Sequence, residues 1–148
     1  ISYLPTSFSN LSNLQSINMD NNLIMSLPLE ITNLYSLQYL YIANNDIEEL
    51  PINIGLLSNL QILSLYSNHL LEIPESIGSL NSLFHLDLTN NGLIMLPNSI
   101  CNIYDNLSVL DISLNNICPP PGMPWAIERA EVPKGSGRMV CREPMEER

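Results

Sequence analysis

The first 127 residues of the chain contain no lysine or arginine. Ten acidic residues precede position 128, and the basic residues all come later: Arg129, Lys134, Arg138, Arg142 and Arg148. Because binding to phosphate requires cations that displace its counterions, residues 1–127 are poor candidates for binding nucleic acid or an anionic membrane. The acidic excess favours a basic or neutral protein partner, or it serves only to keep an apolar chain in solution.

Long apolar runs and regularly spaced cysteines are also missing. The longest apolar runs are too short for a membrane-spanning helix. Cys101, Cys118 and Cys141 match neither a disulfide framework nor a zinc site, so we expect free thiols, a reducing compartment and a cytoplasmic location. Two glycosylation sequons, Asn10-Leu-Ser12 and Asn106-Leu-Ser108, point the other way, but such tripeptides often arise by chance in an asparagine-rich chain.

What the chain has in abundance is a repeat of 23 residues. Each copy opens with a leucine and carries apolar residues three and five positions later, an asparagine eight positions later and, in four copies, an apolar residue followed by proline. The opening residues are Leu14, Leu37, Leu60, Leu83 and Leu107. A fixed period of this length indicates a solenoid, in which each unit buries its apolar side against its neighbours.

One repeat is expected to contain a short strand, a turn and a return segment. Residues 37–42 alternate between apolar and other residues with the period of a strand. Residues 50–57 carry apolar residues every three to four positions behind a proline, which predicts a helical or 3₁₀ turn. Strands joined by such crossovers run parallel, so the repeats together predict one parallel sheet that is buried on one face.

The asparagine of each repeat stands where the chain leaves the strand. Backbone N–H and C=O groups point into the interior at that place and need partners. A buried amide supplies both a donor and an acceptor, and it can bond its own loop and a neighbouring one. We therefore predict a ladder of structural asparagines: Asn22, Asn45, Asn68, Asn91 and Asn115.

The repeat pattern divides the chain near residue 121. Residues 1–121 form the predicted solenoid, which opens in the middle of a repeat and is expected to be a segment of a longer array. Residues 117–148 contain no leucine or asparagine. Residues 122–148 are predicted to be a partial cap over the last repeat, or else a tail that is disordered or foreign to the array. A cap would cover the apolar flank that a terminal repeat exposes.

The pattern L-x-x-L-x-L-x-x-N-x-[LI]-x-x-[LI]-P-x-x-I-x-x-L resembles the 23-residue leucine-rich repeat and covers residues 1–117. Its LP-x-x-I form is most similar to the intracellular, Ras-suppressor-like group. The fourth copy departs from the pattern by one additional residue, within 104–106. The resemblance implies an α/β horseshoe with a parallel β-sheet on its concave face and short helical or 3₁₀ segments on its convex side. It also implies that the concave face binds protein.

Strand geometry selects the residues of that concave face. Since the repeated leucines point inward, the third, fifth and seventh positions of each repeat point outward. Tyrosines and an isoleucine gather there in the central repeats, which is typical of a binding hot spot, although these are also simply good strand residues. Asp87 and Asp111 are expected side by side, where a basic partner or solvent screening relieves their repulsion. The predicted binding residues are Tyr39, Tyr41, Ile62, Ser64, Tyr66, His85, Asp87 and Asp111.

Ser64, His85 and Asp87 share this face, so catalysis has to be considered. The expected register places the aspartate beside the serine hydroxyl, which is the wrong order for activating a nucleophile. The open surface offers no oxyanion hole, and two carboxylates are too few for calcium. We predict a non-catalytic module that binds protein in intracellular signalling or scaffolding, with no metal, cofactor or small-molecule substrate. The alternatives are a ligand-recognising ectodomain of a receptor or effector, and the targeting arm of a larger enzyme.

Overall fold

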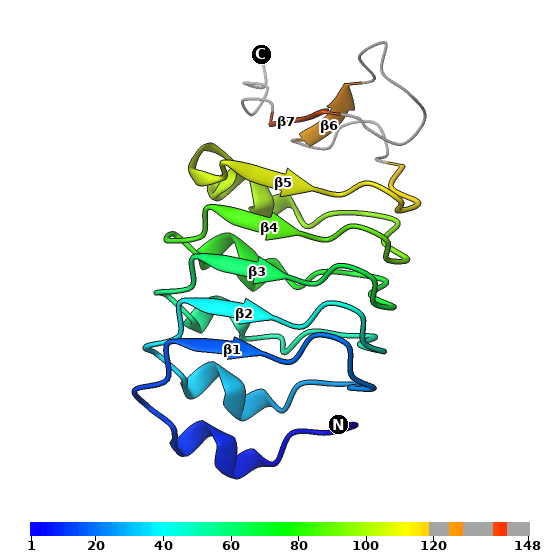
Figure 1. The fold of residues 1–148 in the computed structure, drawn as a ribbon. Coiled ribbons are helices and arrows are strands. Elements are labelled where there is room, and N and C mark those ends of the chain that lie inside the picture. Colours follow the sequence, from blue (N-terminus) through cyan, green and yellow to red (C-terminus); the bar gives the residue numbers. More distant parts are fainter. Residues whose placement is uncertain (119–124, 129–137, 142–148) are drawn as a thin grey trace.

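The computed structural model of the protein describes residues 1–118, 125–128 and 138–141. Within these residues, short parallel strands stack in chain order as one sheet (Figure 1). The strands are β1 (Ser16–Asn18), β2 (Tyr39–Tyr41), β3 (Ile62–Ser64), β4 (His85–Asp87) and β5 (Val109–Asp111). Matching repeat positions stand opposite each other, as Leu40 does Leu63. The predicted parallel sheet is therefore confirmed.

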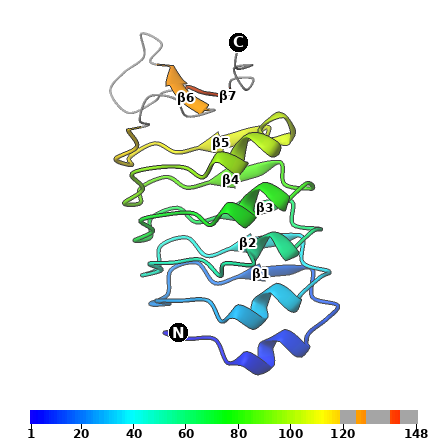
Figure 2. The same ribbon diagram turned by 180° about the vertical axis from the view of Figure 1, so that it is seen from behind.

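Short 3₁₀ turns line the side opposite the sheet (Figure 2). They are η1 (Thr6–Asn10), η2 (Leu29–Asn33), η3 (Ile54–Leu56), η4 (Glu75–Ser79), η5 (Asn98–Asn102) and η6 (Tyr104–Asn106). Proline directly precedes η1, η2, η4 and η5, where its fixed φ suits the start of a turn. The additional residue of the fourth repeat falls in η6, on this convex side, as the sequence predicts.

The apolar core is a continuous column between the sheet and the turns. Leu40, Leu63 and Leu86, at the centres of successive strands, are completely buried, and Ile54 and Ile77 meet them from the turns with no exposed surface. Burying one such side chain stabilises the fold by about 1.5–3 kcal/mol. Because each repeat packs mainly on its two neighbours, the core extends along the stack instead of closing on itself.

Asparagine amides form the ladder at the end of the strands. In Asn68, Oδ1 accepts a hydrogen bond from the Ile47 N–H at 3.0 Å, and Nδ2 donates to the carbonyls of Ile42 at 2.9 Å and Leu65 at 3.1 Å. Each amide thus ties its own loop to the preceding one. The other amides with this set of contacts are those of Asn45, Asn91 and Asn115. Asn22 bonds the carbonyls of its own loop, at Met19 and Asp20.

The residue before each ladder asparagine adopts a left-handed backbone conformation. Its φ lies between 54° and 59° in the five loops that the structure describes. Asparagine tolerates this conformation, and three of the five residues are asparagines: Asn21, Asn44 and Asn90. Ser67 and Leu114 adopt the same conformation without the tolerance of asparagine, which costs about 1–2 kcal/mol of conformational free energy at each residue. The sharp turn is thus kept even where the side chain does not favour it.

Neighbouring 3₁₀ turns approach one another closely at Gly55 and Gly78. A Cβ atom on Gly55 would collide with the carbonyl oxygen of Ser76, and one on Gly78 with that of Ser99. The Ser76 hydroxyl also occupies this space, since it donates to the Ile52 carbonyl at 2.6 Å and accepts from the Gly55 N–H at 3.3 Å. Only glycine therefore fits at these two positions.

Two segments of the C-terminal region form a separate antiparallel pair. Strand β6 (Trp125–Glu128) runs beside β7 (Arg138–Cys141), and Figure 1 places the pair beyond β5. Residues 119–124, 129–137 and 142–148 lie outside the described part of the chain. The boundary at residue 121 and the choice between a cap and a disordered or foreign tail for residues 122–148 therefore stay predictions.

The expectation of free thiols is wrong for Cys101. This residue lies in η5, on the side opposite the sheet, and it is disulfide-bonded, whereas Cys118 is free and exposed. Spacing along the sequence misleads here because a disulfide depends on which Cα atoms the fold brings within reach, not on a regular pattern. Because Cys101 is disulfide-bonded, it no longer supports the inference of a reducing compartment. The cytoplasmic location stays a prediction. Among the described residues, no helix has both the length and the apolar character needed to span a bilayer.

Replacing Asn68 with alanine is expected to lower the free energy of unfolding by roughly 1–3 kcal/mol, because the buried Ile47 N–H and Ile42 C=O lose their partner. Urea denaturation measures the loss. Asn53→Ala serves as the control, since Asn53 is exposed and makes no side-chain cap hydrogen bond. Equal stability of both variants would refute the structural role of the ladder.

The Gly55→Ala variant is expected to lose about 1–3 kcal/mol of stability, because the added methyl group forces the η3 and η4 turns apart. Thermal unfolding checks this against Gly92→Ala, whose new Cβ would meet the flexible end of Leu71 at 2.9 Å and the Leu70 carbonyl oxygen at an ordinary contact distance of 3.4 Å. If Gly55→Ala unfolds at the same temperature as Gly92→Ala, the close approach of the turns is contradicted.

Candidate partner-binding surface

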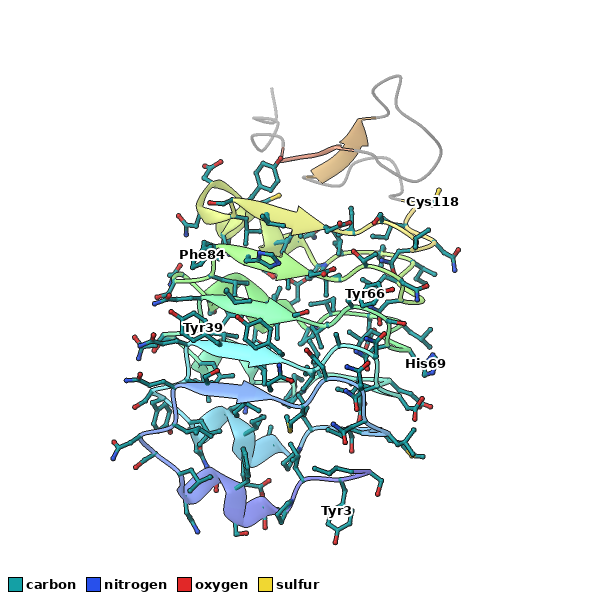
Figure 3. All side chains as sticks on the ribbon, viewed as in Figure 1. Tyr3, Tyr39, Tyr66, His69, Phe84 and Cys118 are labelled. Carbon is teal, nitrogen blue, oxygen red and sulfur yellow. The ribbon has the colours of Figure 1, made fainter. Side chains whose placement is uncertain are left out.

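The outward side chains of the sheet stand in columns across the stack (Figure 3). One column contains the first residue of each strand, Ser16, Tyr39, Ile62, His85 and Val109; another contains the third, Asn18, Tyr41, Ser64, Asp87 and Asp111. We call these residues, together with Tyr66 just after β3, the sheet face. All eight predicted binding residues lie on it, and their register agrees with the expected columns. Whether they bind a partner stays a prediction.

Aromatic and apolar side chains form a platform in the middle of the sheet face. Ile62 lies between Tyr39 and His85 in one column, and Tyr41 lies abreast of Ser64 in the next. The members in the strands are half-buried, and the Tyr39 hydroxyl donates to Gln61 Oε1 at 3.3 Å. Side chains that are already held in place lose little conformational entropy when a partner docks.

The acidic pair Asp87 and Asp111 borders this platform, with the two residues directly abreast. Backbone donors hold both carboxylates: Asp87 Oδ1 accepts from the Thr89 N–H at 2.9 Å, and Asp111 Oδ1 accepts from the Ser113 N–H at 3.0 Å and hydroxyl at 2.6 Å. These donors offset part of the repulsion between neighbouring like charges.

The ionisation of Asp111 follows from the same contacts. Burial raises the pKa of its carboxyl, but hydrogen bonds from Ser113 and Thr89 and the electrostatic attraction of His85 outweigh burial and leave the pKa below its ordinary value. Asp111 therefore carries a full negative charge at neutral pH. A carboxylate fixed in this way presents its free lone pairs to a cationic group of a partner.

The residues considered for catalysis share the face without forming a catalytic unit. Asp87, and not His85, stands opposite Ser64 in the pairing of β3 with β4, which is the register expected from the sequence. In the described part of the chain, no group of three or more histidine, cysteine, aspartate or glutamate side chains is placed to hold a metal ion.

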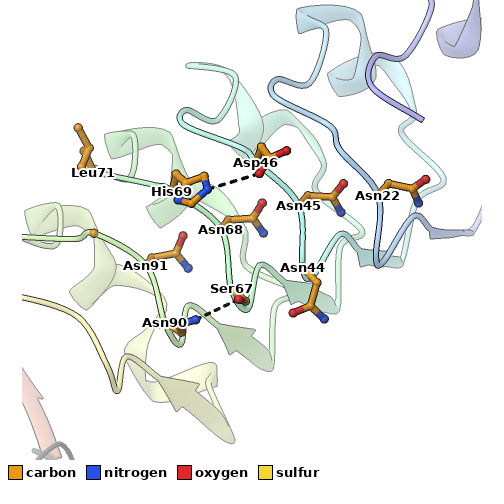
Figure 4. Close-up of a pocket in the computed structure, with 11 residues that line it drawn as sticks. Asn22, Asn44, Asn45, Asp46, Ser67, Asn68, His69, Leu71, Asn90 and Asn91 are labelled. Carbon is orange, nitrogen blue, oxygen red and sulfur yellow. Dashed lines mark hydrogen bonds and ion pairs between the residues drawn. The ribbon is translucent and has the colours of Figure 1, made fainter.

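A groove that the sequence analysis does not anticipate lies at the end of the strands. It encloses about 560 Å³ and runs across successive loops. Figure 4 shows the ladder asparagines along its floor, with His69 and Leu71 on one side and Asn44, Ser67 and Asn90 on the other. We call it the loop groove. The only signal for it in the sequence is the recurrence of polar residues around each ladder asparagine.

Comparison with known proteins identifies the repeats. Residues 36–57, 59–80 and 82–103 each match the family model described as Leucine Rich Repeat. The solved LRR protein LIC12759 of Leptospira interrogans is 33% identical, with a TM-score of 0.68 over 78% of this chain and 35% of its own. The search of the curated proteins found no match.

A second similar structure comes from a plant. It is the LRR ectodomain of the membrane receptor kinase GASSHO1/SCHENGEN3 from Arabidopsis thaliana, in complex with CASPARIAN STRIP INTEGRITY FACTOR 2. Identity is 32% and the TM-score 0.73, over 78% of this chain and 14% of that ectodomain. The chain thus spans only a part of the length of either protein.

From the repeats and the fold together, the chain belongs to the leucine-rich-repeat proteins. The resemblance seen in the sequence is confirmed at this level. Assignment to the intracellular, Ras-suppressor-like group stays a prediction.

The Ser113→Ala substitution is expected to raise the pKa of Asp111, because it removes the hydroxyl that donates at 2.6 Å. NMR titration of the carboxyl carbon measures this, with Ser64→Ala as the control on the same face. Since the folded-state pKa is lowered, the carboxylate stabilises the fold above its unfolded pKa of about 3.9, and this contribution is lost as the pH falls through the folded-state value. An Asp111 pKa that is unchanged in Ser113→Ala would contradict the assignment.

Proposed function

We propose that the solenoid is a non-catalytic interaction module that binds a protein partner on the sheet face. The observation that carries this proposal is the half-buried platform around Tyr39, Tyr41 and Ile62, which lies beside the acidic pair Asp87 and Asp111. Aromatic side chains at the centre of a surface, with charged groups at the edge, are the usual composition of a binding hot spot. The similarity to other leucine-rich-repeat proteins supports the same function. Because the chain spans only part of the length of the similar structures, the role of a longer protein that contains it is also a proposal.

The chemistry of the sheet face defines the partner. The platform accepts an apolar or aromatic side chain, and the adjacent carboxylates accept lysine or arginine. Because residues 1–118 contain no lysine or arginine, no such side chain in this part of the chain forms a salt bridge with the carboxylates. The partner is thus a protein with a basic or neutral surface, and intracellular signalling or scaffolding is the setting in which we place it.

A second candidate function is ligand recognition by the ectodomain of a receptor or by a secreted effector. The disulfide bond of Cys101 favours it, because such bonds persist in oxidising compartments. The sequon asparagines Asn10 and Asn106 are both exposed, at the ends of η1 and η6. Sugars on either residue in the natural protein would favour this candidate over the intracellular one, and sugar-free asparagines with a reduced Cys101 would exclude it.

The test of the sheet face compares two triple variants, each of which removes two large side chains and reverses one acidic charge. The first, Tyr41→Ala/Tyr66→Ala/Asp87→Arg, alters the sheet face; the second, Tyr35→Ala/Ile52→Ala/Asp105→Arg, alters exposed residues outside it. Proteins captured from lysate by the unaltered chain are identified and titrated against both variants by calorimetry. We expect the first variant to weaken binding at least about 30-fold and the second to leave it unchanged.

Folding of both triple variants is checked by circular dichroism, so that a loss of binding is not a loss of structure. The proposal fails if the partner binds the sheet-face variant as tightly as the unaltered chain, or if the second variant weakens binding equally.

A further inference from the structure

The loops that leave the strands form a second ordered surface on one flank of the solenoid. The residue two positions after each of the first four ladder asparagines is fully buried, as Ile47 and Leu70 are, while its neighbours along the chain are more exposed. Backbone hydrogen bonds connect adjacent loops, for example from the Glu48 N–H to the Met25 carbonyl at 3.3 Å and from the Gly92 N–H to the Leu70 carbonyl at 2.9 Å. These bonds fix the backbone from which the outward side chains project.

Large apolar side chains project from this flank into solvent. Met25, Leu71 and Ile94 occupy the same repeat position and are 64%, 64% and 61% exposed, and Met95 beside Ile94 is 42% exposed. On the sheet face, by contrast, Tyr66 is 38% exposed and the other platform residues are less so. Leu71 and Ile94 occupy this position in adjacent repeats, whereas Glu48 occupies it between Met25 and Leu71. Apolar groups gathered in this way on an ordered surface mark an interaction site.

One of these side chains, Leu71, belongs to the wall of the loop groove (Figure 4). Asn44 and Asn90, on the opposite side, are exposed and carry amides with both donors and acceptors. A groove that offers amides on one side and the exposed Leu71 side chain on the other suits an extended polypeptide, whose main chain needs hydrogen bonds and whose alternate side chains need apolar contact.

The charges of the flank select the partner further. Glu48, Glu49 and Glu72 are exposed beside the apolar residues, and Asp46 Oδ1 lies 3.4 Å from His69 Nε2. No lysine or arginine occurs in residues 1–118. Two copies of the solenoid that met through this flank would therefore place acid against acid, which disfavours a second copy as the occupant.

We propose that this loop flank, formed by Met25, Glu48, Leu71, Glu72, Ile94 and the adjoining loop groove, docks an extended segment of a different protein in which basic and apolar residues alternate. Basic side chains meet the glutamates, and apolar ones pack on Leu71 and Ile94. This site is separate from the sheet face, and it stands whether or not the sheet face binds a partner.

The experiment uses a fluorescein-labelled peptide of alternating lysine and valine, titrated with the full chain at low salt and followed by fluorescence anisotropy. The variants Leu71→Ser/Ile94→Ser and Glu48→Lys/Glu72→Lys are each expected to weaken binding about tenfold or more. Peptides of alternating glutamate and valine, or lysine and serine, are expected to bind at least about tenfold more weakly than the lysine–valine peptide. All four altered residues are exposed, and thermal unfolding confirms that the variants fold.

Matched controls separate this site from the rest of the surface. Tyr35→Ser/Ile52→Ser removes equally exposed apolar groups elsewhere, and Tyr41→Ala/Tyr66→Ala alters the sheet face; both are expected to bind the lysine–valine peptide normally. The proposal is overturned if no binding occurs, if lysine–serine binds as tightly as lysine–valine, or if the sheet-face variant alone loses affinity. It is also overturned if the chain sediments as a dimer that Leu71→Ser/Ile94→Ser dissociates, because the occupant would then be a second copy.

Discussion

The structure depends on one requirement: the backbone groups that turn inward at the end of every strand must find hydrogen-bond partners. Each strand of the main sheet contains only three residues, too few to fix a sheet through its own ladder of hydrogen bonds. The asparagine amides supply the missing connections, since Asn68 bonds its own loop and the one before it. Asn68 is 5% exposed, so an unsatisfied partner there would have no water to replace the amide.

This arrangement separates the residues that build the solenoid from those that are free to bind. The leucines fill the core and the ladder asparagines bond the loops, whereas the outward positions of the strands and loops are half-buried or exposed. Folding alone therefore does not explain why Tyr39, Asp87 and Leu71 occupy outward positions, and we propose that they contact partners. Since residues 1–118 contain no lysine or arginine, both the sheet face and the loop flank present acid to a partner, and ionic strength is expected to govern association.

Much of this organisation can be predicted from the sequence because the demands of the fold recur with the period of the repeat. Aligning the leucines suffices to place Tyr39 beside Ile62 and Asp87 beside Asp111, and to predict the amide ladder. Features that depend on the distance between loops or on the tail cannot be read from the period. The loop groove, the close approach at Gly55 and the carboxylate of Glu75, which accepts from the Asn98 and Ser99 N–H groups, belong to this class. The disulfide bond of Cys101 belongs there too.

Native-state hydrogen exchange tests the central role of the ladder most directly. The backbone N–H groups of Ile24, Ile47, Leu70 and Leu93 each donate to a ladder amide at 3.0 Å. If the ladder holds the repeats together, at least the central pair, Ile47 and Leu70, will exchange as slowly as the amides of β2 and β3, through unfolding of the whole array. Rapid exchange at Ile47 and Leu70, while β2 and β3 stay protected, would show that the loops open independently and would contradict the account.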